Sequence, residues 1–236
     1  MKALLVALVA IVASASMAVP KKKEAAGTIA AGPLRISQEG YNLIVYSETG
    51  GAGYYNRALK HVTWPGGASG CTWGCGYDGG YNTKAQIASD WAHLGPERVK
   101  ALQSVAGLKG SAARAALPRV KAVSVSWEEA MVVYQQKTMP RFGKLTGDAF
   151  PRLTELSGDC QATWLSIVFN RGSSLSGGSR LEMRQSRDAI ASGKPQPVPG
   201  YILDMRRLWV NKGLPGLLTR RKAEAALFQK GLNQRP

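Results

Sequence analysis

Residues 36–78 decide the fold of this chain and read ISQEGYNLIVYSETGGAGYYNRALKHVTWPGGASGCTWGCGYD. Ile36, Leu43 and Tyr46 recur at helical spacing, so the first part is predicted to be a short amphipathic helix. Glu39 falls on the same apolar stripe as these residues. Desolvation on the inner face of a helix disfavours a charged carboxylate, and a protonated carboxyl is what general acid catalysis requires. We therefore expect Glu39 to be a general acid.

Further polar residues follow this predicted helix. Glu48 comes nine residues after Glu39, just past the expected helix end, in the Gly-rich segment SETGGAGYY. Thr72 and Asp78 then flank two glycines in TWGCGYD, which predicts a tight hairpin strand. An acid on a helix, facing a solvated carboxylate and a hydroxyl on a small sheet, suits glycoside hydrolysis.

This arrangement resembles the phage endolysin muramidases of glycoside hydrolase family 24. Their signature is a helical Glu, an acidic residue nine positions later, and a Thr in a T-x-G-x-G strand, which Glu39, Glu48 and Thr72 match. Glu48 stands where the family has Asp, and about eighteen additional residues precede Thr72. The related pesticin-like muramidases carry their catalytic Asp six residues after the Thr, where this chain has Asp78. The second catalytic carboxylate is thus Glu48 or Asp78.

The resemblance implies a fold, an activity and a mechanism. The implied fold is α+β and lysozyme-like, with a small N-terminal lobe containing a short antiparallel sheet and a mostly α-helical C-terminal lobe. The implied activity is hydrolysis of the β-1,4 bond between N-acetylmuramic acid and N-acetylglucosamine in peptidoglycan, causing cell lysis, without cofactor or metal. Glu39 would protonate the bridging oxygen, while Glu48 or Asp78, with Thr72, positions a water that inverts the anomeric carbon. A carboxyl separation near 5 Å would favour a retaining route instead, and a transglycosylase would leave anhydromuramic ends.

The C-terminal half extends the resemblance. Residues 161–169 are almost entirely apolar and end in Asn-Arg-Gly, as expected for a central buried helix with a glycine stop. Residues 216–224, GLLTRRKAE, match a closing family segment. They predict a terminal helix with Thr219 as its cap, and with Arg220 and Arg221 on a solvated or ion-paired face.

Two segments of the middle region carry clear helix signals. Ile87, Trp91 and Leu94 form an amphipathic stripe, so Trp91 is expected in a core rather than on a ligand. Residues 126–129 form an S-x-x-E capping box, whose glutamates are expected to serve the helix N-terminus rather than catalysis. That helix is predicted to end before Pro140.

The N-terminal segment predicts export. Residues 1–18 combine one Lys, an apolar run and small residues, which is the pattern of a cleaved signal peptide. A signal-anchor that tethers the protein transiently to a membrane is the alternative. Residues 19–34 are expected to be a linker, and residues 35–236 to form the muramidase domain, in the periplasm or secreted.

Charge indicates an anionic partner. The chain has 31 Lys and Arg against 15 Asp and Glu, a formal net charge of +16. This excess favours polyanions, and the scattered basic residues show no nucleic-acid-binding module. We therefore expect the partners to be peptidoglycan and the anionic bacterial envelope rather than nucleic acid, and the protein to be a monomer.

The cysteine and histidine content excludes a zinc site of the usual kind. No C-x-x-C pair occurs, and His61 and His93 are the only histidines. Cys71 or Cys75 could form a disulfide with Cys160 in an oxidising compartment, or all three could be small buried residues.

Two functions from other classes compete with the muramidase. One is a non-catalytic, cationic wall-binding or virion structural protein that retains the lysozyme fold. The other is direct membrane disruption by the cationic C-terminal helix.

Overall fold

The computed structural model describes residues 27–234, so the predicted signal segment and most of the predicted linker lie outside the described residues. The described chain divides into two compact units. The first unit contains residues 27–44 and 140–234, and the second contains Val45–Met139. The chain passes from one to the other within helix α1 (Gln38–Thr49) and again at the start of helix α7 (Met139–Ala149).

A β-hairpin opens the first unit. Strand β1 (Thr28–Ala31) pairs antiparallel with β2 (Leu34–Ser37), and Gly32 supplies the positive φ of the turn. Ala31, Leu34 and Ile36 are fully buried. The linker prediction is therefore wrong for residues 28–34, because alternate apolar side chains in this short segment enter the core.

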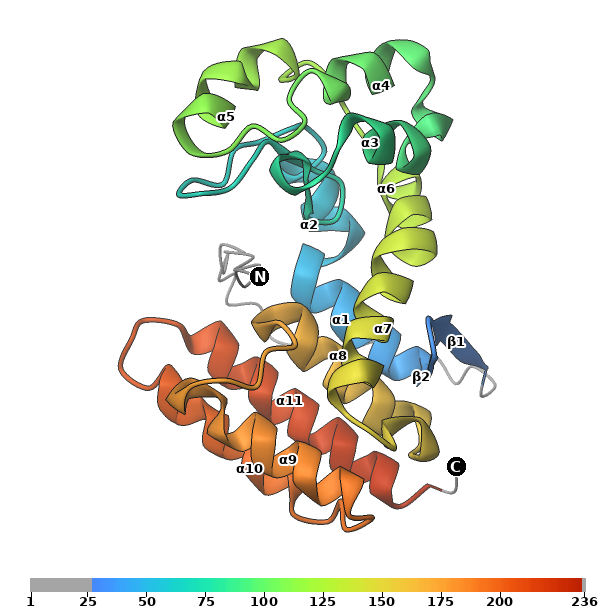
Figure 1. Cartoon of the computed structure of the whole chain (residues 1–236), viewed down its shortest axis with the longest axis vertical. Coiled ribbons are helices and arrows are strands. Elements are labelled where there is room, and N and C mark those ends of the chain that lie inside the picture. Colours follow the sequence, from blue (N-terminus) through green and yellow to red (C-terminus); the bar gives the residue numbers. More distant parts are fainter. Residues whose placement is uncertain (1–26, 235–236) are drawn as a thin grey trace. The chain divides into compact units, whose positions relative to one another are not determined.

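The core of the first unit surrounds helix α8 (Gly158–Arg171), as the apolar run predicted. Gly172, with φ of +73°, follows its last turn and confirms the glycine stop. Helix α11 (Pro215–Leu232) packs against α8, α10 (Val198–Asp204) packs against α11, and α9 (Leu181–Ala191) packs against α10. The last three helices lie side by side in Figure 1. Short helical turns complete the unit: η5 (Leu153–Glu155), η6 (Gly178–Arg180) and η7 (Met205–Leu208).

A buried ionic cluster joins α11 to α8. Arg221 Nε and Arg220 Nε lie 2.6 Å and 3.1 Å from the two oxygens of Glu224, and Ser166 donates to the same carboxylate at 2.6 Å. Arg221 and Glu224 have no exposed surface. The arginines are thus ion-paired but buried, not solvated. Thr219 lies inside α11, which begins at Pro215, so its prediction as the cap is wrong.

The second unit combines short helices with a second hairpin. Strand β3 (Thr72–Trp73) pairs antiparallel with β4 (Tyr77–Asp78). Trp73 and Trp91 are buried with their ring centroids 6.1 Å apart, which confirms the prediction that Trp91 is a core residue. The helices are α2 (Gly51–Ala58), α3 (Lys84–Asp90), α4 (Pro96–Gln103), α5 (Gly110–Ala116) and α6 (Trp127–Val133), with helical turns η1 (Gly79–Tyr81), η2 (Ala92–Leu94) and η3 (Leu117–Arg119).

Helix α6 starts as predicted but does not end as predicted. Ser126 accepts from the Glu129 amide, and the Glu129 side chain accepts from the Ser126 amide, which confirms the capping box. The helix continues through a π-helical segment, η4 (Tyr134–Thr138), into α7. Pro140 lacks an N–H and its ring clashes with the carbonyl of residue 136 in a regular α-helix. The wider π-turn immediately before it accommodates the ring without ending the helix.

The structure therefore confirms a mixed α and β fold that is mostly helical, with two small antiparallel hairpins. Over residues 27–234, no helix has both the length and the apolar character needed to cross a bilayer.

Candidate functional site

Glu39 lies on the surface of the first unit. Its side chain is 61% exposed, and its Oε2 lies 2.5 Å from Nζ of Lys230 near the end of α11. The same ammonium lies 3.1 Å from the buried Asp159, and these contacts raise the pKa of Lys230, with the Glu39 hydrogen bond as the largest cause. The expectation that Glu39 is desolvated among apolar neighbours is wrong.

The reason is that the apolar face predicted for this helix is not the face that α1 buries. Strand β2 extends to Ser37, so Ile36 is not part of helix α1 at all. Tyr46 is 45% exposed. The buried face of α1 is formed by Tyr41, Ile44 and Val45. Glu39 precedes Tyr41 by two residues, about 200° around a helix, and therefore points away from that face.

Glu48 occupies the last turn of α1, within the second unit. The prediction that it follows the helix is wrong, because α1 continues to Thr49. Its side chain is half-buried, and its Oε1 has almost no solvent-accessible surface. Burial, followed by the charge of Glu48, raises the pKa of Cys75 to about 12. Cys75 lies in the turn between β3 and β4, so Glu48 lies beside this hairpin.

Thr72 and Asp78 face each other across the hairpin, whereas their spacing predicted that both lie on one strand; the turn between Trp73 and Tyr77 divides that stretch into β3 and β4. They are register partners in the β3–β4 pair, and directly opposed residues place their side chains on the same face of a sheet. The main chain of Thr72 also exchanges two hydrogen bonds with Thr63, at 2.8 and 2.9 Å. The hydroxyl of Thr72 donates to the carbonyl of Gly70 at 3.3 Å. Thr72 is thus fixed between two neighbouring segments.

The tight turn of the hairpin depends on glycine. Gly74 and Gly76 have φ of +57° and +77°, a region that other residues rarely adopt. A Cβ on Gly74 would also lie 2.6 Å from the Trp91 ring. The T-x-G-x-G spacing therefore reflects both turn geometry and close packing on a buried tryptophan.

Asp78 is bound by backbone amides on two sides. The Gly70 amide donates to Oδ1 and Oδ2 at 3.0 and 3.1 Å, and the Gly80 amide donates to Oδ1 at 2.8 Å. Burial raises the pKa of this carboxyl, while the amides of Gly80 and Gly70 and the charge of Lys109 act against that rise. A raised pKa suits a group that accepts a proton during catalysis.

The second unit thus contains three of the four predicted site residues. Glu48 lies beside the hairpin turn, and Thr72 and Asp78 each lie three residues from Cys75 on its two strands. Glu39 belongs to the first unit. Two carboxyls and a hydroxyl of this kind can protonate a leaving oxygen and orient a water.

Sequence reasoning missed two contributors to the site. Gly70 ends the inserted segment and supplies an amide to both oxygens of Asp78. Lys109 lies 31 residues after Asp78 in the sequence, and its positive charge lowers the pKa of the Asp78 carboxyl. Gly70 belongs to a Gly-Ser turn that looks like ordinary loop sequence, and Lys109 is distant from Asp78 in the sequence. No local sequence pattern therefore indicates that either residue acts on Asp78.

All three cysteines are free thiols. Cys71 and Cys160 are buried, and burial is the largest cause that raises the pKa of each. The prediction of small buried residues is confirmed for these two, and the disulfide to Cys160 is not formed. Among residues 27–234, no group of three His, Cys, Asp or Glu side chains is arranged to bind a metal.

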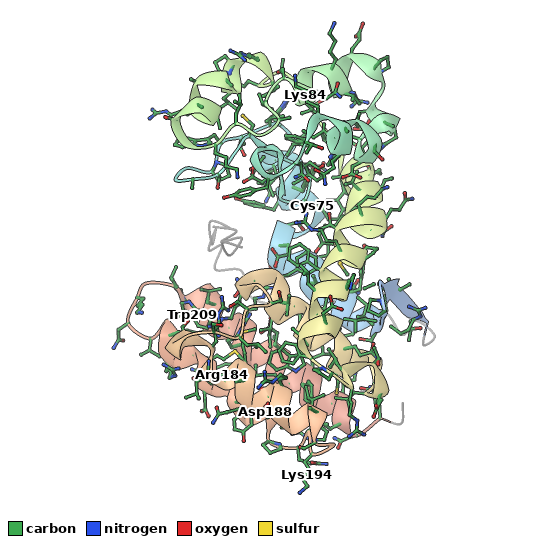
Figure 2. The ribbon with its side chains drawn as sticks, viewed as in Figure 1. Cys75, Lys84, Arg184, Asp188, Lys194 and Trp209 are labelled. Atoms are coloured by element: carbon green, nitrogen blue, oxygen red, sulfur yellow. The ribbon has the colours of Figure 1, made fainter. Side chains whose placement is uncertain are left out.

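A hollow of about 500 Å³ lies on the first unit between α9 and α10. Two of its lining residues, Asp188 and Lys194, are labelled in Figure 2, and Cys75 of the second unit is labelled there too. None of the predicted site residues lines this hollow, and we assign it no role. Its full lining is Gln185, Asp188, Ala189, Ser192, Lys194, Pro197 and Tyr201.

Comparison of the chain with models of protein families and with curated proteins finds no match.

Proposed function

We propose that this protein is a peptidoglycan hydrolase with a lysozyme-like fold, which cleaves the bond between N-acetylmuramic acid and N-acetylglucosamine. We further propose that Glu48, rather than Glu39, is its general acid. The observation that carries the proposal is the pairing of Thr72 with Asp78 across the hairpin, whose turn residue Cys75 is affected by the charge of Glu48 in the same unit. Glu39 is exposed and ion-paired with Lys230, which does not suit a proton donor to a sugar oxygen.

In this proposal Glu48 donates its proton to the bridging oxygen as the bond to the anomeric carbon breaks. Its position in the last turn of α1 fixes the backbone, and the burial of Oε1 limits exchange with bulk water. A general acid must lie within hydrogen-bond reach of the oxygen that it protonates, so a half-buried carboxyl at a fixed helix end suits the role.

Asp78 and Thr72 bind the attacking water. Oδ1 of Asp78 already accepts two amides, whereas Oδ2 accepts one and retains a lone pair for water. The Thr72 hydroxyl on the same face, whose own proton is directed to Gly70, accepts a second hydrogen bond from that water. As the water oxygen bonds to the anomeric carbon, its other proton passes to Asp78, and the configuration is inverted.

The positive net charge of the protein supports the bacterial envelope as the location where it acts. A formal net charge of +16 attracts the protein to anionic wall polymers and membrane surfaces. We propose that the protein is exported and acts on this envelope, with no cofactor.

The structure argues against membrane disruption by the C-terminal helix. In α11, Arg220, Arg221, Leu227 and Phe228 are all buried, so neither its apolar stripe nor these two cations face outward. These two arginines serve the ionic cluster around Glu224 instead.

Digestion of purified peptidoglycan by the wild type, with mass analysis of the released ends, tests the proposal. New reducing ends at N-acetylmuramic acid are the expected result. Anhydromuramic ends would show a transglycosylase. Absence of released fragments, on wall material that the protein still binds, would contradict the proposal and support a structural wall-binding protein.

A further inference from the structure

The loop between α4 and α5 is bonded to the segments that position Asp78. The Gly107 amide donates to the Gly79 carbonyl at 2.9 Å, and the Gly110 amide donates to the Ser69 carbonyl at 2.9 Å. Gly79 and Ser69 are direct neighbours of Gly80 and Gly70, whose amides bind the Asp78 carboxylate. The loop is therefore fixed at both ends against the surroundings of this carboxylate.

Lys109 is the charged residue of this loop. Its Nζ lies 3.7 Å from the ring centroid of Tyr81, the last residue of η1, and Asp78 caps that same helical turn. A Cβ on Gly80 would lie 2.9 Å from Cγ of Lys109, so the lysine stem passes directly over the residue that binds Asp78. The charge of Lys109 also lowers the pKa of Asp78, against the larger effect of burial.

The ammonium of Lys109 is available to a ligand. Lys109 is exposed, and within the described part of the chain no carboxylate forms an ion pair with it. Its charge acts on Asp78, but the two form no ion pair, so this exposed ammonium can bind a further anion beside the aromatic ring of Tyr81. Sugar rings bind against aromatic faces, and a sugar that carries a carboxylate satisfies the ammonium as well.

We propose that Lys109 and Tyr81 form a subsite beside Asp78 that binds a carboxylate-bearing muramyl sugar, and that this subsite selects acidic glycan over neutral glycan. The proposal rests on the muramidase function proposed above and names the feature of the substrate that the site recognises. The carboxylate can come from the lactyl group of the sugar or from its peptide stem.

Binding measurements on three ligands test the subsite and separate these sources. The ligands are muropeptides, glycan strands stripped of peptide so that the lactyl carboxylate is free, and the same stripped strands after amidation, which are neutral. Titration calorimetry uses protein carrying Glu48→Gln, which prevents turnover. The variants added to it are Lys109→Met, which keeps the stem without charge, Lys109→Arg, which keeps the charge, and Lys100→Met, a matched control in α4.

The expected result is a loss of about three- to tenfold in affinity for acidic ligands in Lys109→Met, as for a partly exposed ion pair with a hydrogen bond. Affinity for amidated strands stays unchanged, and Lys109→Arg and Lys100→Met bind like the parent. Loss for muropeptides alone assigns the peptide carboxylate, and loss for stripped strands assigns the lactyl group. Unchanged affinity for both acidic ligands, or an equal loss for amidated strands, would overturn the proposal. Because binding is measured without turnover, the two proposals can fail separately. Absence of hydrolysis by the wild type would contradict the proposed function, while the measured affinities would still test the subsite.

Discussion

Replacement of Asp78 separates its structural role from its chemical role. Asparagine is the close isostere of this aspartate: its Oδ1 still accepts the amides of Gly80 and Gly70, and only the 3.1 Å contact of Gly70 to Oδ2 is lost. We expect Asp78→Asn to change the free energy of unfolding by less than about 1 kcal/mol, the net value of one hydrogen bond. Asp78→Ala leaves two buried amides without an acceptor, and we expect it to cost about 2–4 kcal/mol.

The sign of the pH dependence follows from the raised pKa of Asp78 in the folded protein. A raised pKa contributes stability that is fully present below the unfolded value of 3.8 and is lost as pH rises through the folded pKa. An asparagine side chain does not titrate. The wild type should therefore lose stability relative to Asp78→Asn as pH rises from below 3.8 towards neutral.

Denaturant unfolding across this pH range, together with wall digestion at neutral pH, measures both roles. Asp78→Asn should unfold nearly like the wild type yet digest peptidoglycan at least about a hundredfold more slowly, as expected for loss of a catalytic base. Asp90→Asn is the matched control, because it keeps an acceptor for the Tyr77 hydroxyl. Equal stability of Asp78→Ala and Asp78→Asn would refute the role of Asp78 as acceptor for the two buried amides. Wild-type activity of Asp78→Asn would refute its role as catalytic base.

Two further predictions test the environment of Glu48 and the buried ionic cluster. Glu48→Gln removes a charge that raises the pKa of Cys75, so alkylation of Cys75 at a fixed alkaline pH, followed by peptide mass mapping, should become faster; an unchanged rate would place Glu48 away from the hairpin. Glu224→Gln leaves Arg221 buried without its carboxylate and should destabilise the protein by about 3–5 kcal/mol in denaturant unfolding. Glu155→Gln, at an exposed pair, is its control and should unfold like the wild type, whereas equal effects of the two variants would contradict the cluster's role.

Local sequence signals predicted the hairpin, the central helix and the capping box correctly. Each depends on residues within a few positions of one another: glycines at a turn, an apolar run with a glycine stop, and a Ser–Glu pair three residues apart. The same local pattern did not show that Thr72 and Asp78 lie on opposite strands, because it predicted one strand through both residues. Such patterns fix the local backbone conformation largely independently of tertiary packing, so the predicted elements are present in the folded protein.

The predictions that are wrong concern features that tertiary contacts determine. Helical spacing did not reveal that β2 runs to Ser37, and this shifted the apolar face assigned to Glu39. The contact of Glu39 with Lys230 spans 191 residues and has no local signature. Pro140 normally ends a helix, but the π-turn before it permits continuation, which depends on how the helix packs.

The most direct test of the central claim compares Glu48→Gln with Glu39→Gln in digestion of purified peptidoglycan, with circular dichroism to confirm that both variants are folded. We predict that Glu48→Gln loses activity by about 10²- to 10⁴-fold, the contribution of a general acid, while Glu39→Gln stays close to the wild type. Loss of activity in Glu39→Gln with retention in Glu48→Gln would contradict the assignment of Glu48 and identify Glu39, the surface carboxylate paired with Lys230, as the general acid.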